Sequence, residues 1–404
     1  MSSKNPAIGI PAFATSADGD RLLARLQELV PALRERGQAA EEAGRLPEAT
    51  IDDLKTMDAF RAVVPTRYGG MELPFPYIPQ IFRLLGRGCT STAWCMGFLI
   101  YHNFQFAHFP ADAQDEVWGG RGYTMAPGQV MPSGKAVAVD GGYRLSGRWG
   151  YATGILHGDW MLLSAPVEKD GETLPVQRFY VPVEEFEILD TWHVSGMKAT
   201  GSKDVTLDDA FVPAHRTITV EALRERTGPG LAVNDRPLWR VPLLTFMVFG
   251  AVGPMVGAAE AMLELVGDSL KTKIGAYSGD KQQGLMSQRM RVARLRMELA
   301  ATIGLWEQTI ARIWAEVTAG TTPSRETRIE ARMVVSHVAA KCAAIVEELA
   351  IAAGSRGTYL ASPVQRFRRD AGSLATHALF EYDHVANLFG GTLLDVELPK
   401  DAMI

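Results

Sequence analysis

Cysteine is scarce in this chain. Three cysteines occur among 404 residues, Cys89, Cys95 and Cys342, and none of them forms a C-x-x-C pair. This spacing indicates neither a disulfide framework nor a thiolate metal site. The histidines outside the candidate site described below are not paired with other metal ligands at helical spacing, so we expect no metal. A low cysteine content suits a reducing compartment, and we expect a cytoplasmic protein.

Long apolar runs and an excess of positive charge are also lacking. No stretch reaches the roughly 18 consecutive apolar residues of a membrane span. The nearest, residues 243–266, contains Glu260 and Glu264, which favours a buried helix. The first 20 residues lack the basic start and apolar run of a signal peptide. The net charge of −5 argues against nucleic acid as the main partner, because duplex binding needs a basic face.

Three kinds of pattern follow one another along the chain. Residues 1–120 place apolar side chains at three- and four-residue spacing, which is typical of helices. Residues 121–222 are rich in glycine and proline, and VAVDGGYRLSG indicates a β-hairpin. Residues 235–404 return to helical periodicity, with the last helix expected at about 364–390. We therefore expect an α+β fold, mostly α, with an N-terminal helical domain, a central antiparallel barrel- or sandwich-like β domain and a C-terminal four-helix bundle.

Several short stretches occur in an order that resembles the acyl-CoA dehydrogenase fold. WGYATGILHGDW resembles the flavin-facing strand of that fold, and DTWHVSGMKATGSKDVTLDDAFVPAHRT resembles its strand pair ending in a D-x-x-V-P turn. GSRGTYLASPVQRFRRDA resembles its glycine-rich turn and the helix after it. Each motif alone is weak, but their order and spacing are specific, and the resemblance covers nearly the whole chain.

The catalytic carboxylate of the dehydrogenases is missing where the resemblance places it. Those enzymes remove a proton from carbon with a glutamate, most often eight residues after the aspartate of an R-D pair. Counted from Asp370, this position is Ala378, and a gapped match places Gly390 there instead. The first bundle helix, where a minority carry the base, has no acid in LLTFMVFGAVG. Glu381 and Asp383 lie nearby, and we expect both to be solvated or structural.

His377 points to another branch of the same fold. It lies in RDAGSLATHA, a stretch predicted to be helical, seven residues after Asp370. This spacing resembles the two-component flavin-dependent monooxygenases of the fold, which include the oxygenase component of 4-hydroxyphenylacetate hydroxylase and the steroid phenol and indole hydroxylases. The resemblance implies that reduced FAD or FMN comes from a separate NAD(P)H:flavin reductase. With dioxygen it forms a C4a-hydroperoxyflavin that hydroxylates an aromatic or heteroaromatic molecule. It also implies a homotetramer.

The resemblance makes two histidines the candidate catalytic residues. His377 would donate a proton or a hydrogen bond to the flavin hydroperoxide, since an imidazole with a pKa of about 6.5 exchanges protons near neutrality. The alternative is a helix histidine bonded to a backbone carbonyl. His102 would bind a substrate OH or NH group or accept its proton, and the alternative is a packed core residue.

Two further positions are expected to contact the substrate. Trp94 lies eight residues before His102, as in the phenol hydroxylases, and would form a wall of the ring pocket. An apolar helix also buries a tryptophan for packing alone. Gly128 falls near a serine with which those hydroxylases contact substrate, and this difference argues against a simple phenolic substrate.

The remaining candidate residues are expected to bind flavin. Thr153 matches a hydroxyl beside flavin N5, and Trp149 and Tyr151 would border the ring, although strand residues have these types without any such function. Gly354 and Gly357 permit a close backbone approach, which in the relatives meets the adenosine end of a neighbouring subunit's FAD. Arg369, with Arg366, would meet phosphate, and a salt bridge is the alternative for both arginines.

Three other functions remain open. An acyl-CoA dehydrogenase whose base is elsewhere would use the same fold, as would an N- or S-oxygenase. A non-catalytic flavoprotein would form no oxygen-dependent product with reduced flavin.

Overall fold

The chain, described here by a computed structural model covering residues 11–274, 279 and 281–399, forms two compact units. The first unit contains the chain up to Arg34, Leu73–Thr90 and the chain from Leu244 on. The second contains Glu35–Glu72 and Ser91–Leu243. The N-terminal helices are thus divided between both units. The predicted division into three domains stays a prediction.

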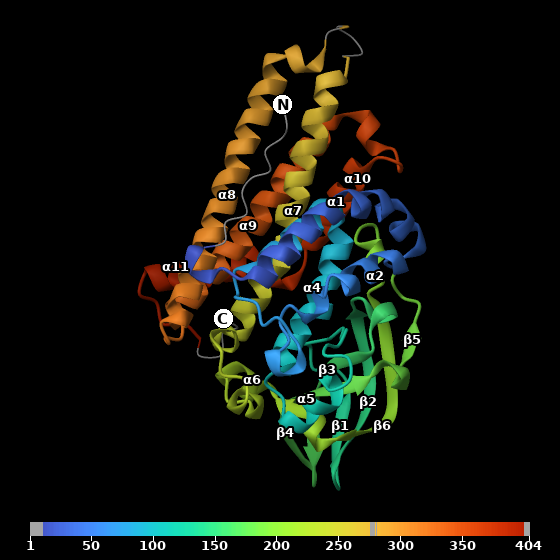
Figure 1. Cartoon of the computed structure of the whole chain (residues 1–404), viewed down its shortest axis with the longest axis vertical. Helices are drawn as coiled ribbons and strands as arrows, with labels where there is room; N and C mark the ends of the chain where they lie inside the picture. Colours follow the sequence, from blue (N-terminus) through green and yellow to red (C-terminus); the bar gives the residue numbers. More distant parts are fainter. Residues whose placement is uncertain (1–10, 275–278, 280, 400–404) are drawn as a thin grey trace. The chain divides into compact units, whose positions relative to one another are not determined.

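Figure 1 shows the elements in the colours of the sequence. α1 (Ala17–Ala43) begins in the first unit and ends in the second. The first unit also contains α3 (Tyr77–Gly88), α7 (Leu243–Thr272), α8 (Met286–Thr318), α9 (Arg325–Ala353), α10 (Pro363–Ala375) and α11 (Tyr382–Leu393). The helices of the second unit are α2 (Glu48–Thr56), α4 (Thr90–Phe106), α5 (Ala111–Trp118) and α6 (Val220–Glu225). Its strands are β1 (Lys135–Val139), β2 (Gly142–Ala152), β3 (Trp160–Lys169), β4 (Glu172–Pro182), β5 (Glu187–Leu189), β6 (Lys203–Pro213) and β7 (Thr217–Thr219).

The strands form a seven-stranded sheet in the order β5-β6-β2-β1-β3-β4-β7. The predicted hairpin is confirmed: β1 and β2 pair antiparallel, with Val139 opposite Gly142. Gly141 in the turn has φ +76°, a conformation that glycine adopts without strain. The expectation of a wholly antiparallel sheet is wrong at one pairing, because β1 and β3 run parallel. Alternation of side chains is the same in both kinds of pair, so the sequence pattern does not encode this difference.

The two faces of the sheet differ in what they contact. Met161 and Leu163 of β3 pack with Trp149 of β2 in an apolar cluster on one face. The side chains that alternate with these along each strand point to the opposite face of the sheet, because successive residues of a strand face opposite sides. On that face Tyr180 of β4 stacks on Phe106 of α4, with 4.1 Å between ring centroids. Helix α4 therefore lies against this face of the sheet.

A buried ion pair joins helices of the first unit. Arg83 of α3 donates to Glu260 of α7 at 2.7 and 2.9 Å and to Glu307 of α8 at 2.9 Å. Gly257 permits this approach, because a Cβ there would lie 2.1 Å from the Arg83 carbonyl oxygen. Helix α7 is long and apolar enough to cross a membrane, yet 89% of its most apolar window is buried within the protein. The expectation of a buried helix is therefore confirmed.

The C-terminal helix predicted at 364–390 is wrong, because the chain forms two helices there. Helix α10 ends at Ala375, and α11 begins at Tyr382. His377 adopts an extended backbone conformation, with φ −70° and ψ 137°. Its Nδ1 accepts a hydrogen bond from the Leu379 backbone N–H at 3.2 Å and so caps the following short turn. RDAGSLATHA is therefore helical only as far as Ala375, and His377 lies in the connection between the helices.

Candidate active site

Three rings form a row along α4. Trp94 contacts Phe98 edge-on at 5.1 Å between ring centroids, and Phe98 contacts His102 at 5.7 Å. The spacing of four residues places all three on one face of the helix. Within Thr90–Phe106, all of which the structure describes, Phe98 is the one residue that is not fully buried. Trp94, which was predicted to form a wall of the substrate pocket, is therefore linked to His102 by the ring of Phe98, and solvent reaches that ring.

His102 is positioned as a hydrogen-bond acceptor. Its side chain is fully buried, and Nδ1 lies 2.6 Å from the carbonyl oxygen of Ala126. Because a carbonyl only accepts, Nδ1 carries the proton and Nε2 keeps its lone pair. Nε2 is buried and has no hydrogen-bond partner among the described residues. Burial, together with the nearby charge of Arg178, lowers the pKa of His102 to about 4, although the hydrogen bond to Ala126 acts in the opposite direction.

Gly128 lies directly against the His102 ring, and its predicted contact with substrate stays a prediction. A Cβ at this position would lie 2.4 Å from Cε1 of His102 and 2.9 Å from both ring nitrogens. Such distances are well below van der Waals contact, so a side chain here displaces the imidazole. Glycine at 128 therefore makes room for His102, and its presence no longer argues against a phenolic substrate.

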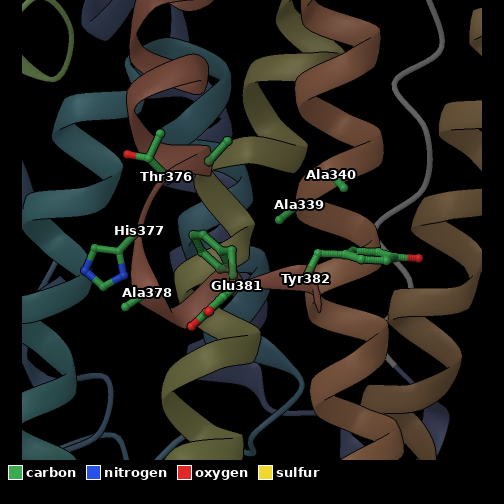
Figure 2. A pocket seen from close by; sticks show the side chains of 9 residues that line it. Ala339, Ala340, Thr376, His377, Ala378, Glu381 and Tyr382 are labelled. Atoms are coloured by element: carbon green, nitrogen blue, oxygen red, sulfur yellow. The ribbon is translucent and has the colours of Figure 1, made fainter. Parts of the chain in front are cut away.

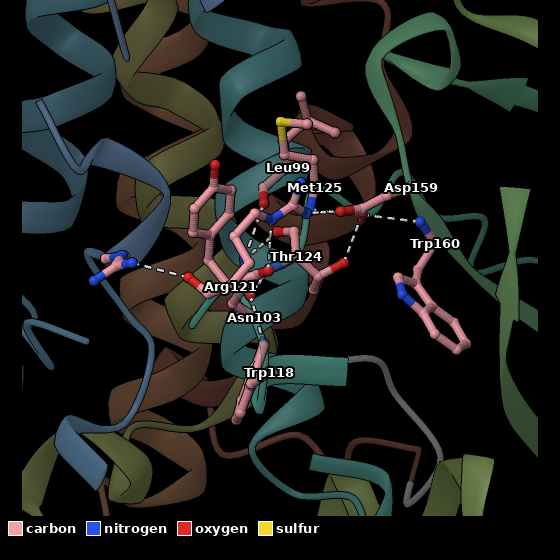
Figure 3. A network of polar contacts seen from close by, with 10 residues as sticks. Leu99, Asn103, Trp118, Arg121, Thr124, Met125, Asp159 and Trp160 are labelled. Carbon is pink, nitrogen blue, oxygen red and sulfur yellow. Dashed lines mark hydrogen bonds and ion pairs between the residues drawn. The ribbon is translucent and has the colours of Figure 1, made fainter. Parts of the chain in front are cut away.

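A polar network that the sequence analysis missed holds the segment before Ala126 (Figure 3). Asp159 accepts hydrogen bonds from Thr124 Oγ1 at 2.7 Å and from the Met125 backbone N–H at 2.9 Å, and it pairs with Arg121. Asn103, next to His102 on α4, accepts from the Thr124 N–H at 3.1 Å and donates to its carbonyl at 2.9 Å. The network thus fixes the strand-like segment whose Ala126 carbonyl sets the His102 tautomer.

The buried histidines predict that acid destabilises the protein. Burial lowers the pKa of His102 and of His108 to about 4, whereas both titrate near about 6.5 when unfolded. Between these values the unfolded chain binds more protons, so the free energy of unfolding falls as pH falls, by up to about 3 kcal/mol per histidine. The melting temperature should therefore be lower at pH 5 than at pH 7. His108→Leu should reduce this difference, whereas His193→Leu at the surface should not, and equal melting temperatures at both pH values contradict the assignment.

A row of hydroxyl groups surrounds Thr153. Its Oγ1 lies 2.8 Å from Ser202 Oγ, which lies 2.7 Å from Thr200 Oγ1. Thr200 Oγ1 donates to the Met197 carbonyl at 2.8 Å. Each hydroxyl has one hydrogen, so Ser202 donates to Thr200 and Thr153 donates to Ser202. The remaining lone pair of Thr153 Oγ1 is then a hydrogen-bond acceptor at the end of the row.

Helix α4 runs beside this hydroxyl row. Cys95 Sγ donates to the Thr200 carbonyl at 3.4 Å, and a Cβ on Gly154 would contact Leu99 at 3.5 Å. The segment that carries Thr153 therefore packs against the same helix that carries His102. Sequence reasoning found Thr153 but missed Ser202 and Thr200, which orient it.

The two predicted flavin-bordering residues of β2 have different surroundings. Trp149 is fully buried, and its Nε1 donates to the Ser164 carbonyl at 3.0 Å. A side chain enclosed in the sheet core has no surface for a cofactor, so we withdraw Trp149 as a flavin contact. Tyr151 is 69% exposed and has φ +60° where the β2–β6 register shifts. A left-handed non-glycine residue in a bulge is a strained arrangement that often lies beside a functional residue, here Thr153.

His377 lines a cavity of the first unit (Figure 2). The cavity has a volume of about 550 Å³, and it is lined by Ala339, Ala340, Ala375, Thr376, His377, Ala378, Phe380, Glu381 and Tyr382. Because His377 Nδ1 accepts from the Leu379 N–H, the neutral ring carries its proton on Nε2. The side chain reaches the surface, while desolvation by the groups around it lowers its pKa. His377 is therefore a neutral donor at pH 7.

A carboxylate shares this cavity with His377, against expectation. We expected Glu381 to be solvated or structural, but the break after Ala375 brings its side chain and that of His377 to one cavity. In Figure 2 the Glu381 carboxylate lies between His377 and Tyr382. Glu381 is therefore a second candidate for acid–base chemistry.

The remaining predicted cofactor residues also belong to the first unit. Gly354 has φ +67°, and a Cβ there would lie 2.8 Å from Lys273 Nζ, which donates to the Ala353 carbonyl at 2.7 Å. Gly357 is packed between Ala353 and Val364. Arg369 donates to Gln365 at 2.7 Å and is partly exposed. The turn is thus compact on its own, and its predicted contact with flavin stays a prediction.

Arg366 lies in the same helix as Arg369. It is buried, and its Nη2 donates to the Arg34 carbonyl at 3.4 Å. Arg366 is thus bonded within its own unit. The His102 row and the Thr153 row belong to the second unit, and His377 belongs to the first.

Comparisons with known proteins describe what the chain is similar to. The family described as acyl-CoA dehydrogenase, C-terminal domain, matches residues 249–382. The oxygenase subunit HsaA, a flavin-dependent monooxygenase of Mycobacterium tuberculosis, is 31% identical over 96% of this chain and 98% of its own length. The crystal structure of HsaA matches with a TM-score of 0.90 at 29% identity, over 96% of this chain and 100% of that one. These matches confirm the predicted acyl-CoA dehydrogenase-like α+β fold.

Two other relatives are named with the cofactor. The oxygenase component of an FADH(2)-dependent resorcinol hydroxylase from Rhizobium sp. is 31% identical, over 94% of this chain and 95% of its own length. XiaF from Streptomyces sp., solved in complex with FADH2 and glycerol, has a TM-score of 0.89 at 28% identity, over 94% of this chain and 97% of that one. Both similarities extend over both units of the chain.

Proposed function

Because this chain belongs to the oxygenase subunits of flavin-dependent monooxygenases, we propose that it hydroxylates a small aromatic molecule with dioxygen and reduced flavin from a separate reductase. The buried, unpartnered Nε2 of His102 beside a row of aromatic rings carries this proposal. A buried polar atom without a partner is costly, so a site that keeps one suits a ligand that supplies the missing hydrogen bond. The relatives favour FADH2 as the flavin, and FMNH2 is the alternative.

The hydroxyl row around Thr153 fits a reduced flavin. Reduced flavin has a hydrogen on N5, whereas N5 of oxidised flavin is an acceptor. Donor accounting leaves Thr153 Oγ1 with a free lone pair, because the hydroxyl hydrogens point along the row toward Met197. Thr153 would thus hold N5–H, and Tyr151 would border the ring. When bound, the flavin supplies the reducing equivalents and the activation of dioxygen.

The two histidines have opposite hydrogen-bonding functions. His102 Nε2 accepts from a ring OH or NH of the substrate and so increases electron density on the ring that receives oxygen. His377, whose Nδ1 is occupied by the Leu379 N–H, would donate from Nε2 to an oxygen acceptor bound in its cavity. Both imidazoles stay neutral at pH 7, because burial lowers the pKa of each. Each imidazole would therefore fix where a proton lies within its own unit.

A second candidate function is acyl-CoA dehydrogenation. One observation favours it: the Glu381 carboxylate lines the cavity of His377 and could remove a proton from carbon. Addition of an acyl-CoA without an electron acceptor would then bleach bound oxidised flavin in the wild type and not in Glu381→Gln. Under the proposed function Glu381→Gln keeps most hydroxylation, because no proton is taken from carbon by this residue.

The partners and location of the protein are also proposals. We propose a homotetramer, a flavin reductase as the source of reduced flavin, and a cytoplasmic location. The exposed apolar side chains of Met286, Met290 and Met297 on α8 suit contact with another subunit. N- or S-oxygenation on the same site is the alternative reaction, and product analysis separates it from ring hydroxylation.

Thr153→Val tests the flavin contact. Valine keeps the shape of threonine but removes the acceptor for N5–H, so reduced flavin should bind about 10-fold more weakly. The affinity for oxidised flavin should fall by less, so the ratio of the affinities for reduced and oxidised flavin should decrease. Anaerobic titrations with FADH2 and aerobic titrations with FAD measure both constants. Thr173→Val, on the exposed part of β4, is the matched control, and equal loss for both flavin forms contradicts the assignment.

A further inference from the structure

Arg178 of β4 is a buried cation without an acidic partner. Arg178 is 7% exposed, and among the described residues no carboxylate lies within ion-pair distance of its guanidinium group. Arg83, which is also deeply buried, pairs instead with Glu260 and Glu307. A buried charge without a counter-charge is destabilising, so its presence requires another explanation. Burial lowers the pKa of Arg178 to about 10, which leaves it charged at pH 7.

The contacts of Arg178 leave its buried Nε donor unused. Nη1 donates to the Gln129 carbonyl at 3.3 Å and to Ser164 Oγ, which is opposite Arg178 in the β3–β4 pair. Nε is buried and has no hydrogen-bond partner among the described residues. A guanidinium N–H only donates, so this atom needs an acceptor.

Arg178 lies close to His102. The two residues hold the same short segment from opposite ends, since His102 bonds to Ala126 and Arg178 to Gln129. Gly128, between these two contacts, lies directly against the imidazole. The charge of Arg178 also acts on the His102 ring. One unused acceptor, His102 Nε2, and one unused donor, Arg178 Nε, are therefore buried together beside the ring row of α4.

We propose that Arg178 and His102 together bind one hydroxyl oxygen of the aromatic substrate, which makes Arg178 the residue that selects phenols over indoles. The hydroxyl hydrogen bonds to His102 Nε2, and the hydroxyl oxygen accepts from Arg178 Nε. An indole N–H donates to His102 but has no lone pair for Arg178. A cationic amine is repelled by the guanidinium. This inference rests on the proposed function for the reaction, but it concerns binding and is measured without turnover.

The test compares three probes of similar size and different hydrogen bonding. 4-Nitrophenol donates and accepts at one oxygen, 4-nitroanisole only accepts there, and indole only donates. Binding to the purified chain, with and without oxidised FAD, is measured by equilibrium titration for the wild type and Arg178→Gln. Arg178→Gln should lose about 10- to 100-fold in affinity for 4-nitrophenol, because a hydrogen bond to a charged group is removed. Indole should change by less than about 3-fold, since it has no lone pair for Arg178. 4-Nitroanisole should bind the wild type more weakly than 4-nitrophenol does, because it cannot donate to His102, and it should lose affinity in Arg178→Gln as well, because its oxygen accepts from Arg178.

Two further measurements separate this binding from a structural effect. The absorption of bound 4-nitrophenol should shift toward that of the phenolate in the wild type and not in Arg178→Gln. Arg178→Lys, which keeps the charge, should recover most of the shift, whereas Arg144→Gln, on the exposed part of the same sheet, should change nothing. Equal losses for all three probes, an unchanged affinity in Arg178→Gln, or no binding of 4-nitrophenol by the wild type overturns the inference. Hydroxylation by the wild type despite any of these results leaves the proposed function standing.

Discussion

His377→Ala should abolish most hydroxylation while flavin oxidation continues. With FADH2, dioxygen and an aromatic substrate, we expect product formation to fall by about 100-fold or more, since a positioned acid or donor contributes a factor of this order. The reason is the tautomer: Nδ1 is occupied by the Leu379 N–H, so Nε2–H is the donor offered to the cavity. Without this donor, oxygen should leave as hydrogen peroxide. Product and peroxide are measured together in single-turnover mixing.

Two variants control for folding in this prediction. His377→Asn keeps an acceptor for the Leu379 N–H and so preserves the turn. The shorter asparagine side chain, however, has no donor that extends as far into the cavity as the imidazole Nε2–H. It should fold like the wild type and still release peroxide. His384→Ala, on exposed α11, should hydroxylate normally. A His377→Ala enzyme with normal coupling would show that His377 only caps the turn.

Gly128→Ala should have the second-largest effect, through His102. The added methyl group would lie 2.4 Å from His102 Cε1, so the buried imidazole must move and lose its 2.6 Å contact with Ala126. Overpacking of this kind costs about 1–3 kcal/mol in stability. Displacement of the acceptor should also weaken substrate binding by about 10- to 100-fold, because its hydrogen bond to substrate is lost. Substrate titration and thermal melting measure the two effects.

Gly120→Ala is the matched control, because a Cβ at Gly120 meets no atom within 4 Å. It should leave both affinity and melting temperature unchanged. His102→Ala should weaken substrate binding to a similar degree, and the double variant should be no weaker than His102→Ala alone. A Gly128→Ala protein that binds substrate as the wild type does would show that the imidazole is not the acceptor.

Local signals in the sequence were enough for most of the elements, but not for one helix break or for the pairing of the strands. The hairpin at Val139 and Gly142 follows from a glycine turn between alternating runs, and α7 follows from its apolar composition and its buried Glu260. The parallel pairing of β1 and β3 depends on residues far apart in the chain, which alternation does not specify. The helix break before His377 was missed because the stretch before it contains no proline or other residue that forces a helix to end. The hydrogen bond from the Leu379 N–H to His377 Nδ1 stabilises the break, but it can form only after the chain has turned.

The candidate site was only partly predictable for a related reason. His102 and Thr153 were predicted through resemblance, and their hydrogen bonds in the structure leave each with a lone pair that could accept a further hydrogen bond. Trp149 was misassigned, because its sequence neighbours do not tell which face of the sheet it occupies. Arg178 and Asp159 were missed altogether, since each is a single charged residue within an ordinary strand or turn pattern. Their importance comes from burial and from partners that are distant in sequence.

Incorporation of labelled oxygen is the most direct test of the central claim that this chain hydroxylates an aromatic ring with reduced flavin. The chain is mixed without air with FADH2 and, in turn, resorcinol, 4-hydroxyphenylacetate or indole, and isotopically labelled dioxygen is then admitted. The account predicts a hydroxylated product from at least one phenol, carrying one labelled oxygen atom and formed only when the flavin is reduced. Products without label from every probe, together with bleaching of oxidised flavin by an acyl-CoA, would contradict it.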